Sequence, residues 1–148
     1  MLSQKCQYAV RSVFELAKRQ GAGPVSVGEI AHAQAIPSRF LEAILVQLKQ
    51  GGFVESRRGN EGGYLLRRKP GELSVGEVIR FVEGTFAPAS CMSSGSKETC
   101  ALQGRCVFLP MWEQAMKAAS DVYDGITFES LVEQESHMGM CSTPSYAI

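Results

Sequence analysis

Residues 25–66 carry the clearest pattern of apolar and polar positions in the chain. Ser26 and Glu29 have the spacing of a capping box, in which each side chain accepts a hydrogen bond from a free backbone N–H at a helix start. Ile30, Ala31 and Ala35 follow at helical spacing. We therefore expect a short helix that carries these three residues on its apolar face.

A second helix is predicted from about Pro37 to Gln50, because proline suits a first helical turn, where its missing N–H would be unpaired anyway. The apolar positions of this helix are spaced i, i+3, i+4 and are expected to face the core: Phe40, Leu41, Ile44, Leu45 and Leu48. Ser38, Arg39 and Glu42 lie near its start and off this stripe. A recognition helix uses such positions to contact base edges in the major groove of DNA.

A basic β-hairpin is predicted directly after the helix pair. Residues 53–57 and 64–66 have the composition of short strands, and the glycines between them supply the backbone freedom of a tip. Arg57 and Arg58 enter the tip, and three further cations, Arg67, Arg68 and Lys69, follow the second strand. Helices and a hairpin that merely pack together are the alternative. The combination favours a winged helix-turn-helix, because a basic hairpin after a helix pair is typical of DNA-binding domains.

The rest of the chain predicts more helices and one long loop. A first helix is expected over residues 3–19, and a second capping box, Ser74 with Glu77, opens a helix that Gly84 ends. Residues 84–106 have no periodicity, and loops of that length are usually functional or disordered. From residue 107 to about 123 a broad apolar stripe returns: Phe108, Met111, Trp112, Ala115, Met116, Ala119 and Val122. A second copy of the chain is the natural cover for this stripe.

These elements predict a mainly α fold with a small β-hairpin, organised as a winged helix-turn-helix domain plus a long dimerisation helix. The expected units are a DNA-binding domain (1–83), a cysteine-containing cluster-binding loop (84–106), a dimerisation helix with a terminal helix (107–135) and a flexible tail (136–148). Thr127 is expected to cap the terminal helix, which should end near Glu135.

Charge separates the two halves of the chain. Residues 1–70 hold 11 Lys and Arg against 5 Asp and Glu, whereas residues 71–148 hold 4 against 10. A basic surface attracts a polyanion, so double-stranded DNA should contact the first half. The sequence has neither an apolar run long enough to span a membrane nor a secretory signal, and we expect a cytoplasmic protein without a membrane partner.

Three of the five cysteines lie in the predicted loop. Eight residues separate Cys91 from Cys100 and five separate Cys100 from Cys106, whereas Cys6 and Cys141 lie near the chain ends. An odd number of cysteines argues against a disulfide framework and for metal or redox use. The three thiols favour an iron–sulfur cluster. Zinc is less favoured because no C-x2-C pair is present. A reversible thiol switch and unligated thiols remain open, and Cys6 is best read as a buried, inert residue.

The combined motifs resemble the IscR/NsrR-type bacterial regulators, which are winged-helix dimers that sense iron–sulfur status, nitric oxide, iron or redox state. The matching segments are residues 8–11 (YAVR), 36–42 (IPSRFLE), 57–66 (RRGNEGGYLL), 74–79 (SVGEVI) and 127–131 (TFESL), together with the three loop cysteines. The resemblance implies a homodimer joined by the long helix and a cluster bound by Cys91, Cys100 and Cys106. It also implies base reading by Glu42 with Ser38 and Arg39, and minor-groove contacts by Arg58 with Arg57.

This chain departs from the family pattern at the fourth cluster ligand. The first two loop cysteines are often closer together in the family. The cluster-regulator subgroup has a histidine where this chain has Leu109, and the nitric-oxide-sensing subgroup has a partner carboxylate at the position of Gln7. The remaining candidates are Gln7 or Cys6 from a second subunit, Cys141 or His137 from the tail, or a small external ligand. The cluster type, [2Fe–2S] or [4Fe–4S], therefore stays open.

The sequence as a whole predicts a DNA-binding transcription regulator controlled by an iron–sulfur cluster that senses redox state, iron, nitric oxide or cluster status. The first alternative is a cluster-free regulator that uses thiol oxidation or zinc at the same cysteines. A thiol redox enzyme is the weaker alternative, because the sequence has no C-x-x-C motif, no His/Asp partner near the loop and no nucleotide-binding glycine motif. We therefore expect a protein that is not an enzyme.

Overall fold

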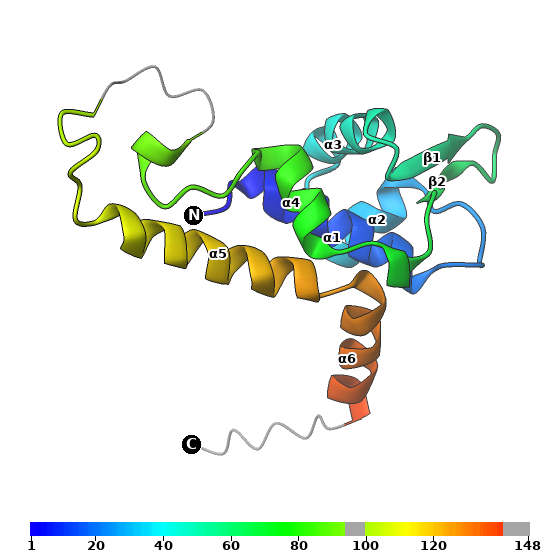
Figure 1. Cartoon of the computed structure of the whole chain (residues 1–148). Helices are drawn as coiled ribbons and strands as arrows, with labels where there is room; N and C mark the ends of the chain where they lie inside the picture. The colour runs from blue at the N-terminus through cyan, green and yellow to red at the C-terminus, as the bar shows by residue number, and fades with distance from the viewer. Residues whose placement is uncertain (94–99, 141–148) are drawn as a thin grey trace, which may run out of the picture.

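The computed structural model describes residues 1–93 and 100–140. Along the chain these residues form α1 (Gln4–Lys18), α2 (Val27–Gln34), α3 (Ser38–Gln50), β1 (Val54–Arg57), β2 (Gly63–Leu66), η1 (Pro70–Glu72), α4 (Val75–Glu83), η2 (Ser90–Met92), α5 (Leu109–Gly125) and α6 (Phe128–Met140) (Figure 1). The described part is mostly helical and has one two-stranded antiparallel sheet. This confirms the predicted mainly α fold with a small β-hairpin.

Helix α1 is the element against which most of the other helices pack. Its start is capped by Ser3, whose Oγ accepts a hydrogen bond from the backbone N–H of Cys6 at 3.1 Å. One face of the helix is buried, with Ala9, Val13 and Leu16 in the core. Because this face contacts α2, α3, α4 and α6, α1 joins the helix-turn-helix to the C-terminal helix (Figure 1).

The capping box that opens α2 is formed as predicted. The Glu29 carboxylate accepts from the backbone N–H of Ser26 at 2.9 Å, and the Ser26 Oγ accepts from the backbone N–H of Glu29 at 3.2 Å. Ile30 and Ala31 are buried, but Ala35 is exposed, so its predicted place on the apolar face is wrong. Ala35 ends the helix in the left-handed region with φ 51°, and this turn puts Ile36 into the core instead.

Helix α3 buries most of its predicted stripe. Its buried residues are Leu41, Ile44, Leu45 and Leu48. The prediction for Phe40 is wrong, because its side chain is 48% exposed. Phe40 lies in the first turn of α3, and its ring flanks an open hollow between this helix and α1 instead of entering the core.

The predicted hairpin is formed by β1 and β2, which pair from Val54 with Leu66 to Arg57 with Gly63. Val25 extends the pairing, since its backbone N–H and C=O both bond to Tyr64 at 2.8 Å. A Cβ on Gly63 would lie 2.3 Å from the carbonyl oxygen of Val25, so this close approach requires glycine. The hairpin is thereby tied to the start of the helix-turn-helix.

The C-terminal helices meet the core through the α5–α6 junction. Phe128 is fully buried, and its backbone N–H donates to the carbonyl of Leu73 at 3.1 Å. Thr127 caps α6 as predicted, because its Oγ1 accepts from the backbone N–H of Ser130 at 3.1 Å. The helix continues to Met140, so the predicted end near Glu135 is wrong and residues 136–140 are helical. The sequence holds no proline between Phe128 and Met140. Residues 141–148 of the predicted tail lie outside the described residues.

Helix α5 buries none of its residues in a single chain. The large apolar side chains left exposed on it and just before it are Val107, Phe108, Leu109, Met111 and Val122. Its C-terminal end contacts α4 through an ion pair of 2.6 Å between Arg80 and Asp124. None of the helices in residues 1–93 and 100–140 has the length and apolar character needed to cross a membrane.

The left-handed conformation at the turn gives a stability prediction. Replacing Ala35 with glycine should raise the free energy of unfolding by about 1 kcal/mol, because glycine adopts this φ without the steric cost of a Cβ atom. Chemical denaturation of both proteins measures the difference. As a matched control, Ala33→Gly in exposed helical backbone should lower stability by roughly 0.5–1 kcal/mol. A destabilising Ala35→Gly change would contradict the strain at this turn.

Candidate nucleic-acid interface and cysteine segment

The residues predicted to read bases are exposed at the start of α3. Ser38, Arg39 and Glu42 occupy its first two turns, and all three side chains face solvent. Together they offer a hydroxyl, a guanidinium and a carboxylate, which are the donor and acceptor types that distinguish base edges in the major groove. The core stripe on the opposite face of α3 holds this surface in place.

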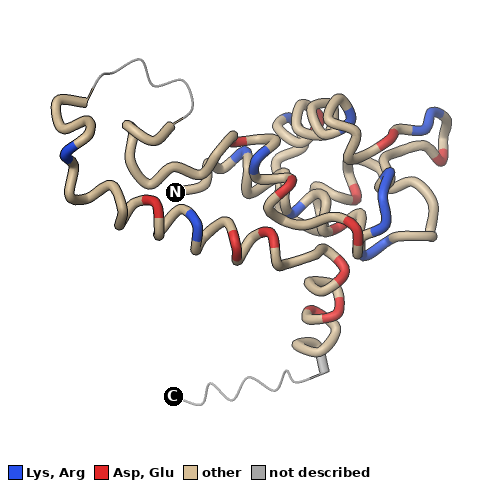
Figure 2. Tube along the Cα trace, viewed as in Figure 1, with Lys and Arg blue, Asp and Glu red and all other residues tan. Residues whose placement is uncertain are grey.

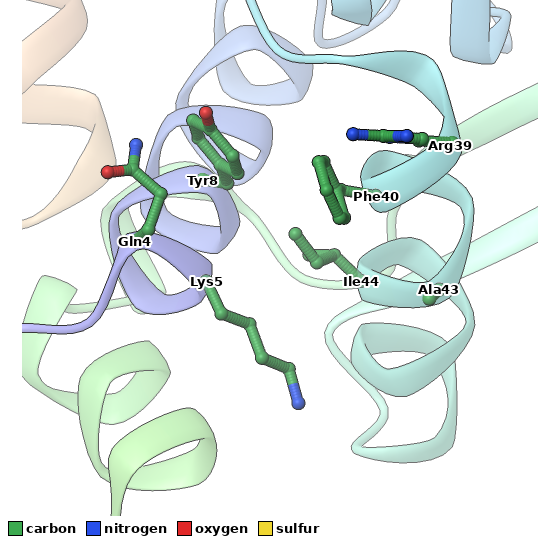
Figure 3. Close-up of a pocket in the computed structure, with 7 residues that line it drawn as sticks. All are labelled: Gln4, Lys5, Tyr8, Arg39, Phe40, Ala43 and Ile44. Carbon is green, nitrogen blue, oxygen red and sulfur yellow. The ribbon is translucent and has the colours of Figure 1, made fainter.

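Arg39 stacks on its neighbour Phe40. The guanidinium carbon lies 4.6 Å from the centre of the ring, which is a cation–π distance. The ring borders an apolar hollow of about 390 Å³ between α1 and α3 (Figure 3). The hollow is lined by Gln4, Lys5, Tyr8, Arg39, Phe40, Ala43 and Ile44. This hollow beside α3 explains why the phenylalanine remains partly open to solvent.

The hairpin contacts α3 through a side-chain hydrogen bond. Lys49 near the end of α3 donates from its Nζ to the Oγ of Ser56 in β1 at 2.6 Å. Arg57 lies 3.5 Å from the carboxylate of Glu55, while Arg58 is exposed at the tip. Cations mark the tip and the base of the hairpin, whereas acidic residues predominate on α5 and α6 (Figure 2). The positive surface therefore lies on the side of the predicted wing.

The three predicted loop ligands are free thiols outside the core. Cys91 is exposed in η2, and Cys100 and Cys106 are half-buried before α5. Within residues 1–93 and 100–140, no three His, Cys, Asp or Glu side chains lie close enough together to hold a metal ion. Residues 94–99, which connect Cys91 to Cys100, lie outside the described residues. The residue types fit a soft metal centre, because iron–sulfur clusters are held by cysteine thiolates and these three cysteines are free and not buried.

The candidates for a fourth ligand lie in very different surroundings. Cys6 is fully buried in α1, and burial together with the charge of Glu83 raises the pKa of its thiol to about 11. Gln7 is exposed and donates from its Nε2 to the carbonyl of Leu2 at 3.1 Å. His137 is exposed on α6, and Cys141 lies outside the described residues. In the described conformation, Gln7 and His137 are accessible whereas Cys6 is not.

Two contacts of this surface were absent from the sequence-based expectations. The stacking of Arg39 on Phe40 joins neighbours in the chain, but the helical spacing of Phe40 indicated a core position. The contact between Lys49 and Ser56 joins a helix to a strand, and no local signal in the sequence predicts it.

Comparison with known proteins decides the family. A family model described as an iron-dependent transcriptional regulator, Rrf2, matches residues 2–134. The chain belongs to the Rrf2 family. It is therefore a transcriptional regulator, which agrees with the resemblance seen in its motifs.

Individual Rrf2-type proteins match over most of their length. The solved structure of T. potens IscR has a TM-score of 0.78 and 32% identity, and the match covers 99% of this chain and 96% of that one. CymR of Bacillus subtilis is 31% identical over 142 residues, which are 93% of this chain and 96% of CymR. A putative rrf2-like regulator of Rhodobacter capsulatus is 38% identical over 103 residues, with coverage of 68% and 69%.

The structure of B. subtilis CymR, which is described as the global cysteine regulator, matches with a TM-score of 0.73 and 30% identity. It covers 90% of this chain and 97% of CymR. The winged-helix fold is therefore shared with Rrf2 proteins of both the IscR and the CymR type.

The burial of the cysteines predicts their reactivity. With iodoacetamide, Cys91, Cys100 and Cys106 of metal-free protein should be alkylated rapidly, while Cys6 should react only after unfolding. Cys6 is protected because its sulfur is inaccessible and its raised pKa keeps it protonated. Mass spectrometry of peptides taken over time measures each rate. Labelling of Cys6 at the rate of Cys91 in folded protein would show that the start of α1 opens.

Proposed function

We propose that this Rrf2 protein is a cytoplasmic homodimer that binds double-stranded operator DNA through α3 and the hairpin. Ser38, Arg39 and Glu42 read base edges in the major groove, with arginine suited to guanine and glutamate able to accept from cytosine. Arg58, together with Arg57, enters the adjacent minor groove. The observation that carries this proposal is the exposed polar start of α3 beside a basic, glycine-tipped wing.

A second copy of the chain supplies the cover for α5. The exposed apolar residues at the start of this helix would cost free energy in water, and a two-fold partner removes them from solvent. A dimer also places two recognition helices on paired half-sites, which is how helix-turn-helix proteins usually engage operators. The apolar face of α5 and the DNA surface on α3 thus belong to one assembly.

Cys91, Cys100 and Cys106 are the residues that would hold an iron–sulfur cluster. Bound there, a cluster would supply a redox-active iron centre. Cys91 follows α4 in the chain, and Cys106 precedes α5 by three residues. The thiols therefore lie on the segment that connects the DNA-binding part to the helix that we assign to the dimer. The family description as iron-dependent and the likeness to IscR support this ligand assignment.

A cluster-free regulator is the second candidate, favoured by the likeness to CymR, which is 31% identical over 142 residues. The related structures include an oxidized form of Staphylococcus aureus CymR, which is 31% identical to this chain. The free thiols of Cys91, Cys100 and Cys106 could support reversible oxidation or zinc binding instead. The two candidates share the DNA surface and differ only in what the thiols bind or become.

The wing assignment predicts a change in salt dependence. Arg58→Ala should weaken operator binding and lower the slope of log affinity against log salt by about one unit, because one cation no longer displaces counterions. The assay uses an operator duplex recovered by selection from random DNA and measures affinity at several salt concentrations.

The matched control for the wing is Lys117→Ala. This change removes one cation from α5, where Lys117 pairs with Asp121 at 2.6 Å. Its salt slope should equal that of the unmodified protein. Unchanged affinity and slope for Arg58→Ala would remove the wing from the interface.

The ligand assignment predicts loss of cluster in a single variant. Protein purified without oxygen should be brown and contain iron and acid-labile sulfide, whereas Cys100→Ala should lose colour and both elements. Ser90→Ala in the same segment, which removes a hydroxyl and no thiol, should retain them.

The spectrum also separates the two candidate functions. A Cys100→Ala protein with the full cluster spectrum would show that Cys100 is not a ligand. An unmodified protein that stays colourless after cluster reconstitution would favour the thiol or zinc regulator, and would leave the DNA surface unaffected.

A further inference from the structure

The exposed ring of Phe40 is unusual on a surface assigned to DNA. Its neighbour Leu41 is fully buried, yet Phe40 leaves about half of its surface in solvent. Figure 3 shows the ring between the guanidinium of Arg39 and the side chain of Ile44, facing the hollow shared with Tyr8. The ring thus has Ile44 on its core side and the guanidinium of Arg39 on another side.

Arg39 differs from several other arginines of the described residues in what holds it. Several others have an acidic partner: Arg19 with Glu15, Arg57 with Glu55, Arg68 with Glu77, and Arg80 with Asp124. No ion pair or side-chain hydrogen bond within residues 1–93 and 100–140 involves Arg39. Its contact is the ring of Phe40, at 4.6 Å. The guanidinium is therefore held while all of its N–H donors remain available.

This manner of holding suits base recognition. A guanidinium reads guanine with two parallel N–H donors, and a carboxylate partner would occupy that fork and neutralise its charge. An aromatic face attracts the cation without consuming a donor. It also limits the conformations of a long side chain before binding, so less entropy is lost when DNA arrives.

We infer that Phe40 is a positioning residue, which holds Arg39 for reading one base pair of the operator and so sets specificity at that position. The inference rests on the proposed function, in which Arg39 contacts a base. Helical spacing alone would place Phe40 in the core, whereas this inference gives it a role on the DNA-binding surface. The role requires an aromatic face at position 40, and bulk or apolarity alone does not fulfil it.

The test compares the DNA sequences selected by full-length variants from a random duplex pool. Arg39→Ala should lose the preference for guanine at one base pair, which identifies the position that Arg39 reads. Phe40→Leu should weaken the preference at that same pair by about 3- to 10-fold and leave the other positions unchanged. Phe40→Tyr retains the ring face and should restore the preference. Thermal unfolding of Phe40→Leu should be nearly unchanged, because the side chain is half exposed.

Two further variants separate positioning from packing. Val46 is 47% exposed on the same helix, so Val46→Ala removes apolar surface there as a control and should leave all base preferences intact. In an Arg39→Ala background, Phe40→Leu should cause no additional loss, because the residue that it positions is gone.

The outcomes that overturn the inference are distinct from those that overturn the proposed function. An unchanged preference in Phe40→Leu, a loss spread evenly over all base pairs, or an additional loss in the Arg39→Ala background would each refute positioning while leaving base reading by Arg39 in place. An Arg39→Ala protein that selects the same sequences as the unmodified protein would refute both.

Discussion

A buried carboxylate on α1 is the interaction on which the arrangement of this molecule depends. Glu15 is 2% exposed, and a buried charge is costly unless it is paired and hydrogen-bonded. Arg19 donates to it from Nε at 2.8 Å, and Gln34 donates from Nε2 at 2.7 Å. Burial raises the pKa of Glu15, but these hydrogen bonds and the charges of Lys18 and Arg19 outweigh it and hold the pKa below its ordinary value. The carboxylate is therefore stable as an anion in the core.

The partners of Glu15 link α1 to α2 and, through Lys18, to α6. Gln34 is the last residue of α2, next to the turn before α3, and its carbonyl accepts from Arg11 of α1. Lys18 lies 3.7 Å from Glu15 and 2.9 Å from Glu135 of α6. Glu15 is thus bonded to α2 through Gln34, and its neighbour Lys18 reaches α6 through Glu135.

The sequence predicted those features whose signals are local. Both capping boxes, the hairpin and the residues exposed at the start of α3 follow from residue types at fixed spacing, and the structure has them where they were expected. The errors arise where the surroundings override the spacing. Phe40 has core spacing but lies beside a hollow, and Ala35 follows a helical pattern yet adopts the turn that ends the helix.

The part of the candidate site that sequence could not predict is its assembly. Eight residues between Cys91 and Cys100 impose no geometry on the two thiols, and a ligand from a second subunit leaves no signal in the spacing of one chain. The same limit applies to the pair Lys49 and Ser56, which meet only because α3 and β1 pack together. Residue types identify which groups can act, whereas tertiary contacts decide which of them meet.

Helix α5 has different surroundings at its two ends. At its C-terminal end α5 is anchored to α4, because Arg80 pairs with Asp124 and a Cβ on Gly76 would collide with that carboxylate. At its N-terminal end the helix leaves Phe108 and Leu109 exposed next to Cys106. If the thiols control operator binding, as we propose, their chemistry acts on this free end and on the second copy that covers it. On the same proposal, such a change would alter the spacing of the two copies of α3.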